Sequence, residues 1–259
     1  HTRSDRDWSS DVCSSDLEYN QRLQEVARGV NTYWLSQPLQ TSLTQKYSAS
    51  LEGGDKNLRY QLNLQYDTNN GVMKGSGRDK YSIGSVLDYN LGDNFRVRNE
   101  LMVSELTEKN SPYGSFSTYA RQNPYERIYD ENGDMVKTFT STNEINPMIN
   151  STLPNRDRTK STIWKDNFSL EWRFLNAFRL TSRISYTKTL AEDETFLSPN
   201  SPTFQNETDV AKKGKATYFD SRETSVDGNI MLSFYKTFKE YHTLNVTAGT
   251  NFTSDEYHG

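Results

Sequence analysis

The sequence predicts an all-β protein, an antiparallel up-and-down sheet of about eight strands, on the strength of three observations. Apolar and polar residues alternate with a period of two over eight separate segments. Short and long connections between these segments alternate strictly along the chain. Aromatic residues, which make up 12% of the chain, gather at the ends of the alternating segments.

The composition excludes several other classes of protein. Hydrophobic residues make up only 33% of the 259 residues and the mean hydropathy is -0.89. No apolar run approaches the ~20 residues of a membrane-spanning helix. The 30 basic and 34 acidic residues give a net charge of -4, which offers no basic surface for nucleic acid. So polar a chain would suggest disorder, but 16 Tyr, 12 Phe and 4 Trp are more aromatic residues than disordered segments carry.

Residues 1–17, HTRSDRDWSSDVCSSDL, differ from the rest of the chain. They have neither apolar periodicity nor the pattern of a secretory signal. The stretch DVCSSDL at 11–17 resembles a translated sequencing adapter, so we expect a non-native leader rather than a genuine disordered N-terminus, followed by an internal part of a longer protein. Cys13 is the only cysteine and lies in this leader. Without it the chain has no thiol for disulfides, metal sites or nucleophilic catalysis.

Residues 18–44 form a mixed, polar segment that leads into the first alternating run. Leu23, Val26 and Ala27 cluster at helical spacing, which predicts a short amphipathic helix near 19–28. We expect this segment to pack on the surface of the sheet.

The alternating segments begin at Gln45, and residues 45–259 are predicted to form the sheet. The clearest segment is 167–174, where apolar and aromatic residues take every second position. Asn99 interrupts the apolar side of its segment, and charged residues are absent from the apolar side of all eight. The predicted strands are 45–52, 58–66, 81–91, 95–104, 167–174, 178–187, 229–235 and 243–252.

The connections between the predicted strands fall into two classes. The short turns lie around 53–57, 92–94, 175–177 and 239–240, and the long links cover 67–80, 105–166 and 188–228. A soluble sandwich with Greek-key links has no reason to place every long link at one end. Short turns at one end and long loops at the other are typical of an outer-membrane β-barrel. We therefore expect an open, curved sheet from a transmembrane β-barrel in the outer membrane of a Gram-negative cell, with long extracellular loops near 105–166 and 188–228.

Aromatic residues mark both ends of the predicted strands, which is typical of the two interfacial girdles of a barrel in lipid. The strand register also keeps charged side chains off the face that is expected to contact lipid. Slipping 167–174 by one residue would turn Glu171 and Arg173 outward, and the Arg alone would cost about 2–4 kcal/mol at mid-membrane. The girdle residues near the short turns are Tyr89, Phe95, Trp172, Phe174, Phe178, Phe234, Tyr235, Phe238 and Tyr241, and those at the opposite ends are Tyr66, Tyr81 and Tyr186.

Three stretches carry a family resemblance: VNTYWLSQPLQTSLTQKYSASLEGGDKNLRY at 30–60, NSPYGSFSTYARQNPYERIYDENGD at 110–134 and NPMINSTL at 146–153. Within the first, NTYW at 31–34 and GG at 53–54 are the most specific parts. In their order and spacing they resemble the segment entering the barrel, the long external loop and the segment after that loop in SusC/RagA-like TonB-dependent outer-membrane transporters.

The resemblance covers residues 18–259 and implies a plugged barrel of about 22 strands, of which this chain supplies about eight. It implies TonB-dependent import of oligosaccharides or peptides. The implied partners are a SusD-like surface lipoprotein over the external loops, the TonB-ExbB-ExbD complex, which would act through segments absent from this chain, and outer-membrane lipid. Plug and TonB-contact residues are not carried over, because their segments are not in this sequence.

Catalytic and metal sites are not expected. His1, His242 and His258 have no metal-ligand spacing, and no nucleophile with a nearby base or carboxylate pair stands out. DENGD at 130–134 invites a calcium interpretation, but its glycine is not at the sixth position of the loop. We expect instead a small hairpin in which residues 128–129 face 135–136 across an Asn-Gly turn. No cofactor is predicted.

Substrate contacts are predicted in the long loop, because rings stack on sugar faces and loops on a rigid scaffold concentrate binding. The candidate substrate-binding residues are Tyr113, Phe116, Tyr119 and Tyr125. The alternative is that these rings pack the loop onto itself or onto the lid lipoprotein. The Arg and Glu residues of the polar face are expected to form a solvated lumen wall or contact the plug, and a substrate path is the alternative.

Three other functions stay open at this point. A passive small barrel would close on itself by pairing its first and last strands. A secreted soluble carbohydrate-binding β-protein would bury its apolar stripes in a two-layer core. An outer-membrane lipase-type enzyme is weakened by the lack of a usable His near Ser and Asp.

Overall fold

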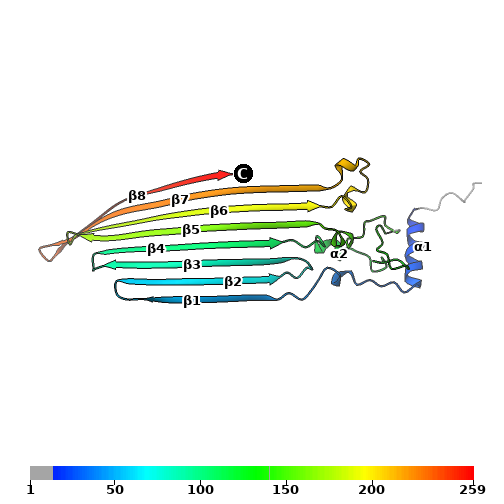
Figure 1. Cartoon of the computed structure of the whole chain (residues 1–259), viewed down its shortest axis with the longest axis horizontal. Coiled ribbons are helices and arrows are strands. Elements are labelled where there is room, and N and C mark those ends of the chain that lie inside the picture. Colours follow the sequence, from blue (N-terminus) through cyan, green and yellow to red (C-terminus); the bar gives the residue numbers. More distant parts are fainter. Residues whose placement is uncertain (1–13, 140) are drawn as a thin grey trace, which may run out of the picture.

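The computed structural model describes residues 14–139 and 141–259, with side chains described from Tyr19 onward. One antiparallel eight-stranded sheet holds the strands in chain order (Figure 1). This confirms the predicted all-β, up-and-down fold. The strands are β1 (Thr44–Gly54), β2 (Leu58–Asn70), β3 (Gly77–Leu91), β4 (Phe95–Lys109), β5 (Arg156–Phe174), β6 (Phe178–Leu197), β7 (Lys215–Phe238) and β8 (His242–His258).

The sheet is a single open layer with two free edges. Within the described residues, β1 pairs with β2 alone and β8 with β7 alone. A closed eight-stranded barrel would pair β8 with β1, so the passive small barrel is not what this chain forms. The two-layer core of a soluble sandwich is not found either, because large apolar side chains such as Leu51, Leu62 and Leu244 are exposed on one face of the sheet.

Tight turns join the strands at one end, on the left of Figure 1, and the longer segments lie at the other end. Gly54 begins the β1–β2 turn with φ +130°, and a Cβ there would lie 2.0 Å from the carbonyl oxygen of Leu58. Only glycine fits this position. The backbone N–H groups of Leu58 and Asn57 donate to the Asp55 carboxylate at 2.8 Å each and hold its pKa below the usual value. This explains the second glycine of the GG pair.

Strand register places the apolar residues of all eight strands on one face. The β2–β3 pairing sets Leu64 beside Ile83 and Tyr66 beside Tyr81. The predicted girdle residues of the strands lie on this face, except Tyr235, which pairs with Asn245 on the opposite face. Near the short turns, ring centroids lie 4.7 Å apart for Trp172–Phe174, 5.4 Å for Phe174–Phe178 and 4.9 Å for Phe178–Phe234. At the opposite ends, they lie 6.2 Å apart for Tyr47–Tyr66 and 4.6 Å for Tyr66–Tyr81.

The strands extend further toward the long-loop end than the alternation predicts. β5 starts at Arg156 rather than 167, β6 continues to Leu197, and β7 starts at Lys215 rather than 229. The loops between them are therefore 110–155 and 198–214, shorter than 105–166 and 188–228. The reason is that these extensions carry polar residues on both faces, for example Arg158 and Lys160 on the face that is apolar lower down. The period-two pattern therefore ends before the strands do.

Helices are few and short, and they lie with the long loops. They are α1 (Ser14–Ala27), α2 (Phe116–Ala120) and the 3₁₀ helices η1 (Trp34–Ser36), η2 (Ile149–Thr152), η3 (Pro202–Phe204) and η4 (Val210–Lys212). The predicted helix near 19–28 is present but begins earlier, at Ser14. Cys13 and the rest of 1–13 lie outside the described residues, so the non-native leader stays a prediction. No helix in the described part of the chain is long and apolar enough to span a bilayer.

Candidate functional site

The apolar face of the sheet forms a belt of constant height. On β2 the outward apolar residues run from Leu58 to Tyr66, and on β8 they run from Leu244 to Phe252, nine residues in each case. Polar residues follow directly above both segments, among them Thr68 on β2 and Ser254 on β8. Nine residues match the length of a tilted membrane-spanning strand, about 9–11.

The belt slopes across the strands. The row of paired residues that starts at Leu58 on β2 crosses the sheet and ends at Thr250 on β8. Thr250 lies six residues beyond Leu244, where the apolar segment of β8 begins. The upper edge shifts by the same amount, because the row that starts at Tyr66 ends at His258. Six residues of about 3.3 Å over six strand spacings of about 4.8 Å give a tilt of roughly 35°. Barrels in outer membranes have strands tilted by about 35–45° to the membrane normal.

The opposite face is polar and carries a network of ion pairs near the short turns. Asp88 on β3 accepts from the Nε of Arg96 on β4 at 2.8 Å, and Arg98 binds Glu100 at 2.6 Å. Farther across the sheet, Glu171 on β5 binds Arg179 on β6 at 3.2 Å. These partly exposed pairs lie on four neighbouring strands, β3 to β6.

Two hollows lie side by side on this polar face and share Arg96 and Arg98. One, of about 690 Å³, extends toward Arg59 and Asp88, and the other, of about 630 Å³, extends toward Arg183. The hollows are open and mostly lined by charged and hydroxyl groups, which suits a wall in contact with water or with polar protein. This agrees with the expected lumen wall.

The three stretches that carry the family resemblance meet in one cluster beyond the long-loop ends of the strands. Its buried residues are Trp34, Tyr119, Phe139 and Met148, with Tyr113 packed against them. The Trp34 ring lies edge-on to Phe139 with centroids 5.6 Å apart, and its indole N–H donates to the carbonyl of Asn123 at 2.9 Å. We call these four residues the loop core.

Asn146 holds the loop core together from within. Its side chain is fully buried and donates to the carbonyls of Val136 at 2.8 Å and Ile128 at 3.3 Å. Its side-chain oxygen accepts from the backbone N–H of Met148 at 2.9 Å. Buried polar groups are tolerated when they are bonded in this way. Asn146 begins the stretch NPMINSTL at 146–153, but nothing in the sequence indicates this role.

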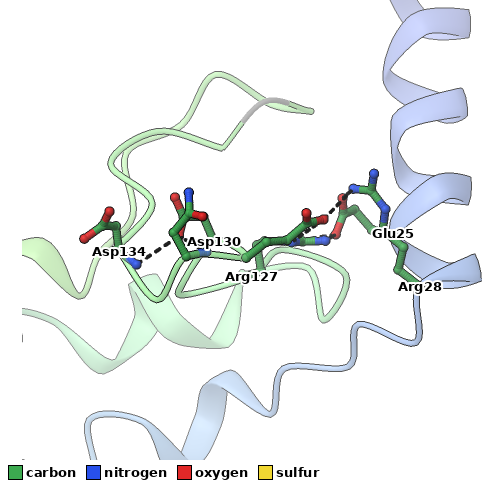
Figure 2. Close-up of polar contacts among 7 residues, drawn as sticks. Glu25, Arg28, Arg127, Asp130 and Asp134 are labelled. Carbon is green, nitrogen blue, oxygen red and sulfur yellow. Dashed lines mark hydrogen bonds and ion pairs between the residues drawn. The ribbon is translucent and has the colours of Figure 1, made fainter.

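The segment DENGD forms the predicted hairpin. Tyr129 pairs with Met135, and the N–H of Val136 donates to the carbonyl of Ile128 at 2.9 Å. The Asp130 carboxylate accepts from the backbone N–H groups of Asn132 and Asp134 at 2.9 Å each (Figure 2). A single carboxylate oxygen of Asp130, Oδ1, therefore stabilises the turn. Among the described residues, no group of three or more metal-binding side chains is close enough to hold an ion.

Helix α1 contacts the hairpin through charged residues. Glu25 binds Arg127 from the loop and Arg28, the residue that follows its helix, the latter at 3.0 Å (Figure 2). Arg127 and Glu25 are each less than one quarter exposed. Between helix and hairpin lies a hollow of about 480 Å³, whose lining includes Tyr125 and Glu126.

The structure separates the four candidate substrate-binding residues into two pairs. Tyr119 is fully buried in the loop core, where its hydroxyl donates to the carbonyl of Pro147 at 3.1 Å and burial raises its pKa. Tyr113 is half-buried beside it, with ring centroids 6.5 Å apart. Phe116 and Tyr125 are 40% and 38% exposed. Two rings thus pack the loop onto itself, and two remain accessible to a ligand.

Comparisons with known proteins agree with this architecture. The chain is 22% identical over 228 residues to TonB-dependent receptor P26 of Formosa agariphila, and covers 22% of that protein. It superposes on the RagAB peptide importer with TM-scores of 0.68 in the closed-closed state and 0.69 in the open-open state, both at 14% identity. These superpositions cover 88% and 99% of this chain, and 27% and 30% of the solved chains. No family model matches.

The chain therefore spans less than a third of each of these relatives. The resemblance stated from NTYW, GG and NPMINSTL is confirmed by a sequence relative and by solved folds. The chain is therefore similar in sequence to a TonB-dependent receptor, and its fold is similar to that of the RagAB peptide importer.

Proposed function

We propose that this chain forms part of the wall and the external loops of a TonB-dependent importer of oligosaccharides or peptides. The observation that carries the proposal is the sloping apolar belt backed by a polar, ion-paired face, with the loop core at one end. In this arrangement the belt contacts lipid and the polar face lines the lumen. Substrate would bind outside, beneath a SusD-like lipoprotein, and TonB-ExbB-ExbD would act on segments beyond this sequence.

Two features of the loop region support a role in substrate contact. The loop core fixes 110–155 against the segment before β1, so the exposed rings of Phe116 and Tyr125 stand on a rigid support. Tyr125 also lines the hollow beside α1, together with Arg127 and Glu126. A ring next to charges of both signs can stack on a sugar or on a peptide side chain and bond its polar groups. Catalysis forms no part of the proposal.

Uptake by cells that express the full-length protein tests the proposal. Labelled oligosaccharides and labelled peptides are offered to cells with and without TonB, and we expect uptake of one class that depends on TonB. The double variant Phe116→Ala/Tyr125→Ala should reduce uptake while leaving the amount of folded protein unchanged. Uptake that is independent of TonB would contradict the importer.

The matched control for the loop residues is Tyr129→Ala. Its side chain is 52% exposed on the same loop but lies on the hairpin, outside the lining of the hollow. A loss of uptake that is equal for this variant and for the double variant would show that the effect is structural. The exposed pair would then hold no substrate.

A further inference from the structure

The outer edge of the belt has an uneven charge distribution. On β1–β4 the first outward charged residues beyond the edge are the acidic Asp79 and Glu105. On β6 the first outward residue beyond Tyr186 is Lys188, and on β7 Arg222 lies two outward positions beyond Val226. Cations thus stand next to the apolar edge only on the β5–β8 side of the described sheet.

Lys188 and Arg222 are neighbours on the same face. Lys188 lies opposite Thr224 on β7, and Arg222 is the next outward residue along that strand. Trp164 on β5 pairs with Lys188 from the other side and is 46% exposed. The two cations and the ring form a contiguous surface, which we call the edge site.

The edge site has no counter-ion in the described chain. The neighbouring cation Lys160 binds Glu105 at 3.2 Å, and Arg156 binds Glu194 at 2.8 Å. Neither Lys188 nor Arg222 has a carboxylate within 4.0 Å among residues 14–139 and 141–259. Carboxylates on the same face near the site are Asp166, Glu192, Asp220 and Glu256. Asp166 accepts from the side-chain amide of Asn99 at 2.5 Å, and Glu256 is hydrogen-bonded to His258 at 2.9 Å.

The height of the edge site matches a lipid headgroup. At a tilt of roughly 35°, Lys188 stands about 5 Å and Arg222 about 11 Å beyond the apolar edge. The polar layer of a bilayer extends about 5–8 Å beyond its hydrocarbon core, and long Arg side chains bend back toward it. A tryptophan at the same height is an interfacial anchor.

We propose that the edge site binds the phosphate group of an anionic lipid in the outer leaflet, with Lys188 and Arg222 as its counter-ions and Trp164 against its acyl chains. The inference rests on the proposed function, because it requires the belt to be embedded in a membrane. It adds a specific lipid position on one side of the barrel wall.

Binding of diphosphoryl lipid A to the full-length protein in neutral detergent tests the proposal. The variant Lys188→Gln/Arg222→Gln should bind roughly thirty-fold more weakly, because each cation near an anionic surface contributes about 1 kcal/mol. The matched control is Lys165→Gln/Arg183→Gln, which removes two cations from the opposite face of β5 and β6. It should bind as the wild type does. Equal affinity of both double variants for lipid A overturns the proposal. Displacement of lipid A by inorganic phosphate at the same concentration also overturns it.

A second measurement separates this proposal from the importer. A nitroxide at Ala248→Cys, with Cys13 replaced by Ser, reports whether the belt enters the bilayer of reconstituted vesicles. If the label is in lipid and the loss of Lys188 and Arg222 does not change the affinity for lipid A, only the edge-site proposal is wrong. If the label is in water, the membrane-embedded wall is wrong as well.

Discussion

The side-chain amide of Asn99 donates a hydrogen bond of 2.5 Å to the Asp166 carboxyl group across β4 and β5, on the apolar face of the sheet. In the sequence, Asn99 is an interruption of the apolar pattern. In the structure it is the partner of an acidic residue that would otherwise face lipid. A carboxyl group there is tolerated because it has a donor and because it lies near the outer edge of the belt, beside Tyr186.

This pairing predicts non-additive effects of substitution. Asn99→Leu leaves Asp166 without its donor and should lower the free energy of unfolding by about 1–3 kcal/mol. Asn99→Leu/Asp166→Leu should recover most of that loss, because neither polar group then remains. Denaturant unfolding of the full-length protein in detergent measures both. Additive losses would mean that the two side chains do not interact.

An introduced charge should cost much more stability on one face of β7 than on the other. Ile230 lies at the centre of the belt and Asn229 lies next to it on the polar face. Ile230→Arg should destabilise the protein in bilayers by about 2–4 kcal/mol, and Asn229→Arg should cost far less. The folded fraction after assembly into vesicles, read from gel mobility without heating, gives the comparison. Similar losses for both variants would argue against lipid on the apolar face.

Asn146 should stabilise the loop core without affecting the sheet. Asn146→Ala leaves the carbonyls of Val136 and Ile128 and the N–H of Met148 without their partner and should cost about 1–3 kcal/mol. Hydrogen exchange should then become faster in 110–155 while β2 and β3 keep their protection. The exposed Asn132→Ala at the hairpin tip serves as control and should leave exchange in the loop core unchanged. Faster exchange throughout the sheet would contradict this separation.

The loop core should weaken at alkaline pH. Burial, with Tyr113 nearby, raises the pKa of Tyr119 above its ordinary value of about 10. Because the folded pKa is the higher one, the contribution of Tyr119 is complete below pH ~10 and is lost as the pH rises through the folded pKa. Hydrogen exchange in 110–155 should therefore accelerate above about pH 10 beyond the intrinsic rate. Tyr119→Phe should abolish this extra acceleration, and its persistence in that variant would assign it to another group.

The sequence predicts the parts of the fold that lipid dictates. Within the belt, one face must be apolar, so Phe168, Leu170 and Trp172 alternate with polar residues and reveal both strand and register. Above the belt this constraint ends, and Arg158 or Arg222 can stand where an apolar residue would be required lower down. A period-two pattern therefore does not predict where β5, β6 and β7 end on the long-loop side.

The loop region could be predicted only in part. The hairpin at Asn132-Gly133 is a local structure with its own turn residues, and it forms as expected. Trp34 and Tyr119 are far apart in the chain, and nothing in either neighbourhood indicates that they pack together. Which rings are buried and which are exposed depends on that packing. The candidate substrate-binding residues predicted from the sequence therefore include both Tyr119, which is buried, and Phe116, which is exposed.

The most direct test of the account is the depth of three nitroxide labels in the membrane-embedded protein, at Leu62→Cys on β2 and at Ala248→Cys and Ser254→Cys on β8, each with Cys13 replaced by Ser. Leu62 and Ala248 are the centres of their belt segments, whereas Ser254 shares the paired row of Leu62. A belt tilted by roughly 35° places Ser254 about 16 Å above Ala248, outside the hydrocarbon. We expect oxygen to reach the labels at 62 and 248 and a water-soluble paramagnetic reagent to reach the label at 254. Equal depth for 62 and 254, or water at all three labels, would contradict the barrel wall.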